Sequence, residues 1–240
     1  MSGASRSNRS KRGAALILVV LVTSVLAAST AGAQEQEREK RRPDYYLTAL
    51  AGGTWATGDA EGGTIADGPL GGSGSDSSPF GGAALGTILD LGPIDLRLEL
   101  EGVGGRSLRF TTPSPNGAYV TNADVWTLQG NFWFEYSLGR LLPDTPIVRD
   151  IAPFGGGGLG LSRVSLASAD GTNFGSSESS KLAWQAGGGL SYQPIPWLSF
   201  EARYQYIDMG GATVPLNSVA GPQGELDMDL GAHEVVGGIR

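Results

Sequence analysis

The strongest constraint on the fold is an alternation of apolar and polar side chains with a period of two residues. It is clearest at residues 125–138, where one face carries Trp126, Leu128, Gly130, Phe132, Phe134, Tyr136 and Leu138, and the other Thr127, Gln129, Asn131, Trp133, Glu135 and Ser137. Successive side chains of a β-strand point to opposite faces, whereas a helix would mix the two sets around its circumference. This stretch is therefore predicted to be a strand.

The same period recurs along the chain and predicts an all-β domain. Residues 45–56, 80–91, 94–102, 154–167, 182–193, 198–206 and 230–240 alternate in this way, which makes eight predicted strands with 125–138. No stretch beyond the first 33 residues has the ~18 uncharged apolar residues that a further transmembrane helix would need.

The connections between these strands are predicted to alternate in length. Residues 91–93 and 193–196 form tight turns, and 139–153 is longer but contains three prolines. The other four connections are longer on average and rich in Gly, Ser, Asp and Asn: 57–79, 105–122, 168–180 and 209–228. Membrane barrels have short inner turns and long outer loops. The rhythm predicts an eight-stranded antiparallel up-and-down transmembrane β-barrel with four extracellular loops and both termini on the inner side.

The first 33 residues have the pattern of a cleavable signal peptide. Four basic residues precede an apolar stretch at 14–28, and the small-x-small sequence Ala31-Gly32-Ala33 follows. The alternative is an uncleaved anchor, but about 15 apolar residues is short against the ~20 that a spanning helix needs. We expect a signal peptide at 1–33, a polar periplasmic lead-in at 34–43 and a barrel domain at 44–240.

Composition excludes several classes of function. Without the four basic residues of the leader, 13 basic and 24 acidic residues remain, a net charge of −11 that argues against nucleic acid as a partner. The chain has no cysteine, so it forms no disulfide, and its single histidine, His233, excludes a metal site built from several histidines. The 39 glycines are far above the usual share, and within strands they permit sharp curvature.

Alternation alone does not say whether the apolar face lies inside or against lipid, but charges and aromatic residues favour lipid. An eight-stranded barrel is just wide enough to be filled by side chains, so charges of both signs can pair within it. We expect an interior ion network of Arg97, Glu99, Glu101, Glu135, Glu201, Arg203 and Glu234. Two aromatic girdles are expected at the bilayer surfaces: Trp55, Trp126, Trp184 and Tyr206 near the long loops, and Tyr45, Tyr136, Tyr192 and Trp197 near the short turns. The alternative is a secreted soluble barrel with a solvated charged face.

Three segments carry a resemblance to a known family: residues 46–53 (YLTALAGG), 152–160 (APFGGGGLG) and 232–240 (AHEVVGGIR). They resemble the small outer-membrane β-barrel superfamily, the OmpA/OmpX/Opa-like porin family, and the resemblance covers about residues 45–240. It implies an outer-membrane location, with the lipid bilayer and the barrel-assembly machinery as partners. Members usually end on an aromatic residue, whereas this sequence ends at Arg240, so we expect either a continuation or an atypical insertion signal.

No motif points to catalysis, a cofactor or a metal. His233 has no serine beside it and is expected to face lipid or the rim, and the pair Glu99 and Glu101 is better explained by neighbouring arginines than by acid–base chemistry. The glycine runs lack the Lys-Ser/Thr of a phosphate loop. The leading hypothesis is a structural or surface-interaction barrel that is not an enzyme. The alternatives are a narrow pore or carrier for small solutes and a lipid-modifying enzyme; the external ligand or protein partner is unknown.

Overall fold

The computed structural model describes residues 44–65, 67–115, 117–142, 144–145 and 147–240. The predicted signal peptide (1–33) and lead-in (34–43) lie outside these residues. The described part of the chain contains eight strands and two short 3-10 helices: β1 (Asp44–Thr64), β2 (Gly68–Asp90), β3 (Asp95–Ser114), β4 (Gly117–Glu135), η2 (Leu138–Arg140), η3 (Val148–Asp150), β5 (Ile151–Ala169), β6 (Phe174–Ile195), β7 (Leu198–Ser218) and β8 (Gly221–Ile239). No helix in these ranges is long and apolar enough to cross a membrane.

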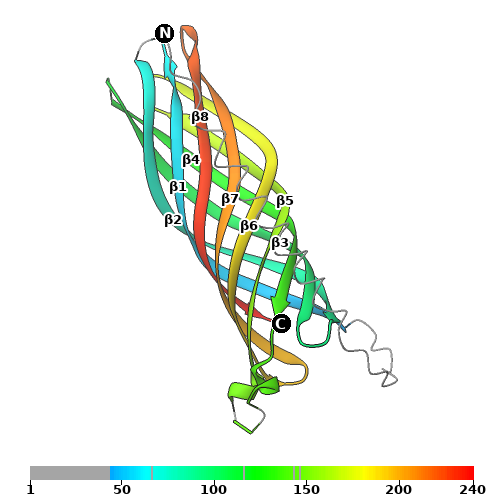
Figure 1. The fold of residues 1–240 in the computed structure, drawn as a ribbon. Coiled ribbons are helices and arrows are strands. Elements are labelled where there is room, and N and C mark those ends of the chain that lie inside the picture. The colour runs from blue at the N-terminus through cyan, green and yellow to red at the C-terminus, as the bar shows by residue number, and fades with distance from the viewer. Residues whose placement is uncertain (1–43, 66, 116, 143, 146) are drawn as a thin grey trace, which may run out of the picture. The chain divides into compact units, whose positions relative to one another are not determined.

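The strands form one closed, up-and-down barrel (Figure 1). Each strand is antiparallel to the next, and β8 closes the ring against β1 in a ladder from Ala49↔Ile239 to Thr64↔Gly224. Each of the eight predicted strands overlaps one observed strand. The predicted fold class is therefore confirmed.

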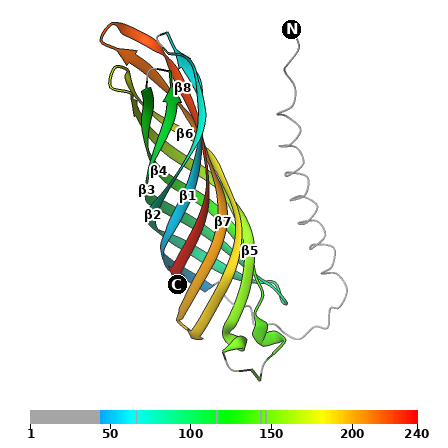
Figure 2. The ribbon, with the colours of Figure 1, turned by 90° about the vertical axis from the view of Figure 1, so that its left-hand side faces the viewer.

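The prediction of long outer loops is wrong. Residues 57–79, 105–122, 168–180 and 209–228 mostly continue the strands, and the connections at that end shrink to 65–67, 115–116, 170–173 and 219–220 (Figure 2). The longest connection, 136–150, lies at the opposite end and contains η2 and η3. Its Arg140 guanidinium donates to the carbonyl of Gly92 and lies 3.5 Å from Asp95, which ties this connection to the β2–β3 turn.

The physical reason for the error is that alternation continues past the membrane-facing segments with its polarity reversed. On β8, the side chains of Leu226, Met228 and Leu230 are buried inside the barrel, whereas Asp227 and Asp229 point outward. A high content of Gly, Ser and Asp resembles a loop, but pairing with at least one neighbouring strand gives main-chain groups hydrogen-bond partners. The sequence signal was present at 225–230, where acidic and apolar residues alternate strictly.

The barrel therefore has two halves of opposite polarity. We call the half with the connection 136–150 the inner half, and the half with the connections 65–67, 115–116, 170–173 and 219–220 the outer half. In the inner half, Leu98 and Leu100 point outward while Arg97, Glu99 and Glu101 are buried. In the outer half the buried side chains are apolar: Ala56, Ala60, Leu70, Leu108, Phe110, Tyr119, Ala123, Val125, Val164, Leu166, Ile207, Met209, Ala212, Val214, Leu216, Leu226, Met228, Leu230 and Ala232. The outer half is thus built like a water-soluble β-protein, with its apolar side chains facing inward.

Two β-bulges lie close to this change of polarity. One interrupts the β3–β4 ladder between Val103 and Arg106, and the other interrupts the β7–β8 ladder between Asp208 and Gly210. Gly105 has φ +85° and Gly210 has φ +70°, which only glycine adopts easily. Each extra residue shifts the alternation by one, so that even-numbered residues of β3 and β7 face inward beyond the bulge.

Interior glycines set the closeness of β4 and β5. A Cβ atom on Gly156 would lie 2.0 Å from the carbonyl oxygen of Phe132, whereas one on Gly130, in the same strand pair, would meet nothing closer than 3.9 Å. We predict that Gly156→Ala lowers the free energy of unfolding by about 1–3 kcal/mol because main-chain atoms must shift. Gly130→Ala is the matched control. Urea unfolding in lipid vesicles measures both, and equal midpoints for the two variants would contradict the prediction.

Candidate functional site

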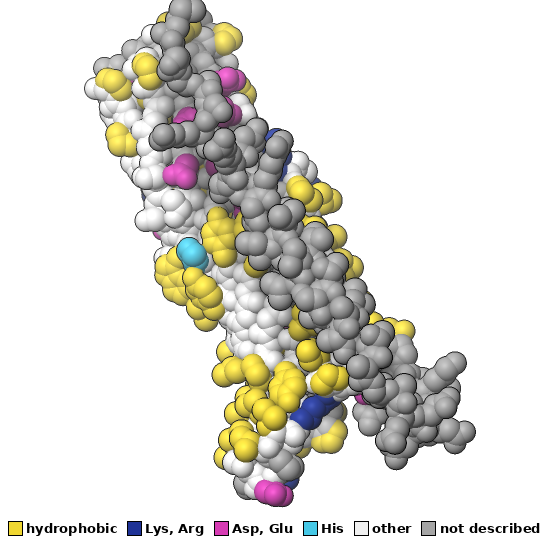
Figure 3. Space-filling model, viewed as in Figure 1, with side chains coloured by type: hydrophobic (Ala, Val, Ile, Leu, Met, Phe, Trp, Pro, Cys, Tyr) yellow, Lys and Arg dark blue, Asp and Glu magenta, His cyan; other side chains and the backbone are white. Residues whose placement is uncertain are grey.

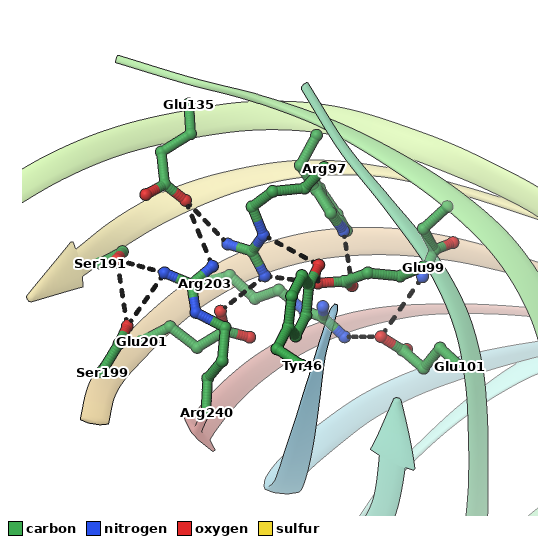
Figure 4. A network of polar contacts seen from close by, with 12 residues as sticks. Tyr46, Arg97, Glu99, Glu101, Glu135, Ser191, Ser199, Glu201, Arg203 and Arg240 are labelled. Atoms are coloured by element: carbon green, nitrogen blue, oxygen red, sulfur yellow. Dashed lines mark hydrogen bonds and ion pairs between the residues drawn. The ribbon is translucent and has the colours of Figure 1, made fainter. Parts of the chain in front are cut away.

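Arg97 is the centre of the largest ion cluster in the lumen (Figure 4). Its Nη2 lies 2.5 Å from Glu99 Oε1 and 2.9 Å from Glu201 Oε2, and its Nη1 lies 3.1 Å from Glu135 Oε2. The Tyr46 hydroxyl accepts from Arg97 Nε (3.3 Å) and donates to Glu99 (2.6 Å). The arginine side chain is wholly buried. A buried guanidinium with three carboxylates around it satisfies most of its N–H donors without water.

A second cluster surrounds Arg203. Its Nη2 lies 2.5 Å from Glu101 Oε2, which also accepts from Asn131 Nδ2 at 3.3 Å. Gln185 donates to Asn131 (2.9 Å). The Arg203 guanidinium lies over the Trp133 ring at 5.2 Å, and the Trp133 indole donates to Glu99 at 2.9 Å, which joins the two clusters.

A third ion pair lies nearer the outer half. Arg106 Nε and Nη2 reach the two oxygens of Glu234 at 2.6 and 3.2 Å, Gln205 donates to the same carboxylate, and Arg106 Nη1 donates to Thr127. The guanidinium also lies over the Phe80 ring at 4.8 Å. Sequence reasoning missed Arg106 because its segment was assigned to a loop, and because the bulge changes which residues of β3 face inward.

The structure places all seven predicted network residues in the lumen, but as a main cluster and two smaller groups rather than one ring. Glu234 pairs with Arg106 instead of with the predicted arginines. Arg240 is a further addition: its guanidinium lies 3.5 Å from Glu135, donates to Ser191 and Ser199, and lies over the Tyr46 ring. Sequence alone gives no pairing, because cross-barrel neighbours depend on register.

The four aromatic residues that were predicted to form a girdle near the long loops, here called the upper set, lie on the outer wall near the change of polarity. The Trp184 and Tyr206 rings are 5.5 Å apart, and His233 lies 5.2 Å from Tyr206; Figure 3 shows the histidine next to hydrophobic side chains on the outer surface. Trp55 is the ladder partner of His233, and Trp126 is exposed on β4. His233 Nδ1 is 2.7 Å from the Tyr204 hydroxyl, so the only histidine faces outward, away from the lumen.

The four aromatic residues that were predicted to form a girdle near the short turns, here called the lower set, lie toward the inner end. Tyr45 and Trp197 are largely exposed, and Tyr192 is about one-third exposed. Tyr136 follows directly after β4, where its N–H donates to the carbonyl of Pro153. The two sets are thus separated along the barrel wall.

A buried polar cluster joins the hairpins at the outer end. The Tyr119 hydroxyl donates to Asp67 Oδ2 and accepts from Asn173 Nδ2, both at 2.8 Å, and Thr64 also donates to Asp67. Burial and the hydrogen bond to Asp67 raise the pKa of Tyr119. Partial burial disfavours the charge of Asp170, but N–H groups of Asn173 and Thr172 outweigh it and hold the pKa of Asp170 below its usual range.

The described residues hold no group of three or more His, Asp or Glu side chains that could bind a metal ion. The carboxylates of the lumen are instead engaged by arginines. The arrangement can therefore hold paired charges in the lumen.

Removing one carboxylate from the Arg97 cluster should destabilise the barrel. Glu201→Leu leaves part of a buried guanidinium without a partner, and we expect a loss of about 2–4 kcal/mol, as also for Glu99→Leu or Arg203→Leu. The control is Glu178→Leu, which removes a half-exposed partner of Arg163 and should cost less than about 1 kcal/mol. Denaturant unfolding gives both values, and an unchanged midpoint for Glu201→Leu would rule the prediction out.

Asp170→Asn should weaken the outer end in a pH-dependent way. Because the pKa of Asp170 is lower in the folded state, its charge stabilises the fold above its ordinary pKa, and this contribution is lost as the pH falls through the lowered value. The variant should unfold earlier than the parent at neutral pH, and this difference should shrink as the pH falls through the lowered pKa of Asp170. Asp144→Asn, on the inner connection, is the control. A difference that persists in acid would contradict the prediction.

Comparison with known proteins agrees with this architecture. The family model described as the outer membrane protein beta-barrel domain matches residues 19–235. Curated protein sequences give no match. Among solved structures, the chain is similar to neisserial surface protein A (13% identity, 80% of this chain and 98% of that chain covered, TM-score 0.38) and to OprG from Pseudomonas aeruginosa (14%, 80% and 94%, 0.38). It is also similar to the outer membrane protease OmpT from Escherichia coli (8%, 82% and 98%, 0.39).

The family match covers most of the chain, and a closed β-barrel is the architecture that the family name describes. The chain therefore belongs to the outer membrane protein beta-barrel domain family and is a transmembrane barrel of the outer membrane.

Proposed function

We propose that this protein is a non-conducting barrel that stabilises the outer membrane and presents its outer half to external partners. The observation that carries the proposal is a lumen filled by side chains at successive levels. The Arg97 cluster and the Arg203 group occupy the inner half, the Arg106–Glu234 pair follows, and apolar side chains fill the outer half. A solute would have to displace both buried ion pairs and a packed apolar core.

The polarity of the wall supports a defined position in the membrane. The outward leucines of the inner half suit hydrocarbon, and the upper and lower aromatic sets suit its two surfaces. The strands beyond the upper set carry outward Ser, Thr, Asp and Glu, so we infer that the outer half stands in water outside the cell. We also infer that residues 1–33 direct export and that the barrel-assembly machinery inserts the barrel.

We propose no catalytic role. The single histidine lies on the outer wall with the Tyr204 hydroxyl as its polar partner, and the buried carboxylates are paired with arginines. Incubation of the purified protein with lipopolysaccharide, followed by mass spectrometry of the lipid, tests this assignment. Any change of lipid mass that requires the folded protein would contradict it.

Conductance in planar bilayers tests the main proposal. The purified protein should insert without discrete channel openings, because ion pairs and an apolar core block the lumen. Folding of the added protein is checked by electrophoresis, since a folded barrel should migrate differently before and after boiling in detergent. Reproducible single-channel steps from the folded form would overturn the proposal in favour of a narrow pore.

A further inference from the structure

The hydrogen-bond ladder of the outer half is interrupted at two places. Between β2 and β3 it runs only from Asp90↔Asp95 to Gly81↔Gly104. Between β6 and β7 it lacks paired residues from Phe174↔Asn217 to Trp184↔Asp208. The other six ladders continue into the outer half. Beyond the membrane the barrel therefore becomes two four-stranded sheets, β7-β8-β1-β2 and β3-β4-β5-β6, with seams at β2–β3 and β6–β7.

Side-chain chemistry marks these seams as strand edges. At the β2–β3 seam, side chains replace part of the ladder: Ser78 Oγ accepts from the N–H of Ser107 and Asp76 Oδ2 from the N–H of Arg109. Proline lacks a main-chain donor and within sheets is confined to edges, and four prolines lie in the outer parts of the seam strands, at 69, 79, 113 and 215. At the β6–β7 seam no side chain takes over the ladder in the same way among the described hydrogen bonds.

The two sheets differ sharply in charge. Residues 54–80 and 207–232, which form the outer part of β7-β8-β1-β2, contain eight acidic residues and no lysine or arginine. Asp59 lies directly opposite Asp229, and Glu61 directly opposite Asp227, with all four side chains exposed on the outer wall. Like charges directly opposite one another in a ladder repel. This wall is therefore complementary to a cation.

The strand between these carboxylates and the β6–β7 seam is sterically open. The outward side chains of β7 in this region belong to Gly211, Thr213 and Pro215, which are short, and Gly211 and Thr213 are the ladder partners of Asp229 and Asp227. A long basic side chain on a strand added at the β7 edge could pass over β7 to these carboxylates. At the outer end of the seam, a groove of about 470 Å³ is lined by β4, β5, β6 and β7, with Phe174, Pro215 and Asn217 at the seam, and gives room for the end of such a segment.

We propose that the β7 edge at residues 209–216 binds an extended, positively charged segment of an external protein as an added strand. The unladdered main-chain groups of the edge would recognise the backbone of the segment, and Asp227 and Asp229 its basic side chains. The neighbouring β6 segment, 175–183, must move aside. It lies against β7 at Lys181 beside Gly210 and at Gly175 beside Pro215. It can move together with β5, to which its ladder joins it, without breaking a β6–β7 pair between residues 175 and 183.

The test uses the full protein refolded in zwitterionic detergent and three labelled eight-residue peptides. One alternates lysine and threonine, one alternates glutamate and threonine, and one is the lysine peptide with alternate main-chain nitrogens methylated. Fluorescence anisotropy should show the unmodified lysine peptide binding about tenfold more tightly than either of the others, because only it offers both charge and donors. Hydrogen exchange should slow at 209–216 when this peptide binds.

Variants locate the charge contribution. Asp227→Asn combined with Asp229→Asn should weaken binding of the lysine peptide about tenfold. Asp124→Asn, which removes an outward carboxylate from β4 in the other sheet, should leave binding unchanged. Both variants are compared after gel mobility shows that they are folded.

Three outcomes would overturn the inference: equal binding of the methylated peptide, protection of another segment on binding, or no binding of the lysine peptide. Self-association of the protein without peptide, with protection of 209–216, would likewise overturn it by assigning the edge to a second copy. The inference rests on the proposed function. Loss of peptide binding alone would overturn the inference, whereas channel openings in planar bilayers would overturn the proposed function.

Discussion

Main-chain hydrogen bonding in hydrocarbon is the constraint on which this structure depends. Lipid offers no partner for a free N–H or C=O group, so a sheet that crosses the bilayer must close on itself. The β1–β8 ladder provides that closure, and the two interrupted ladders are continuous at the levels of the outward leucines Leu85, Leu98 and Leu190. Interruption is confined to the outer half, where water can satisfy an edge. The position of the seams is thus consistent with the depth of the bilayer.

Closure of only eight strands makes the lumen narrow enough for side chains to fill, and different kinds of side chain fill its two halves. Where the wall faces lipid, the inward side chains are charged and paired, because the outward positions already carry the apolar residues. Where the wall faces water, the apolar residues turn inward and pack as in a soluble protein. The glycine bulges at residues 105 and 210 adjust the alternation of β3 and β7 close to this transition. The same eight strands thereby face lipid in one half and water in the other.

The same transition explains where interaction is expected. In the membrane, the wall is continuous and its chemistry is that of any lipid-facing surface. Outside, the barrel becomes two sheets of different charge with unladdered edges at the two seams, joined at the far end by the hydrogen bonds of Tyr119 to Asp67 and Asn173. Edges of natural sheets are usually protected by polar side chains and proline, and both are present here. The β7 edge lies beside the β6 segment 175–183 and next to an all-acidic wall, which gives it a defined chemical preference once that segment moves aside.

The sequence by itself determined the strands, their number and the inward position of residues such as Arg97, Glu99 and Arg203, because a period of two leaves little freedom once one face must meet lipid. It did not determine where strands end: Gly- and Ser-rich segments at 57–79 and 209–228 are compatible with loop or strand until a neighbour offers hydrogen bonds. Nor did it determine pairing. Arg106 with Glu234, and Arg97 with Glu201, are more than 100 positions apart in the chain, and only the register of the closed ladders brings their charges together.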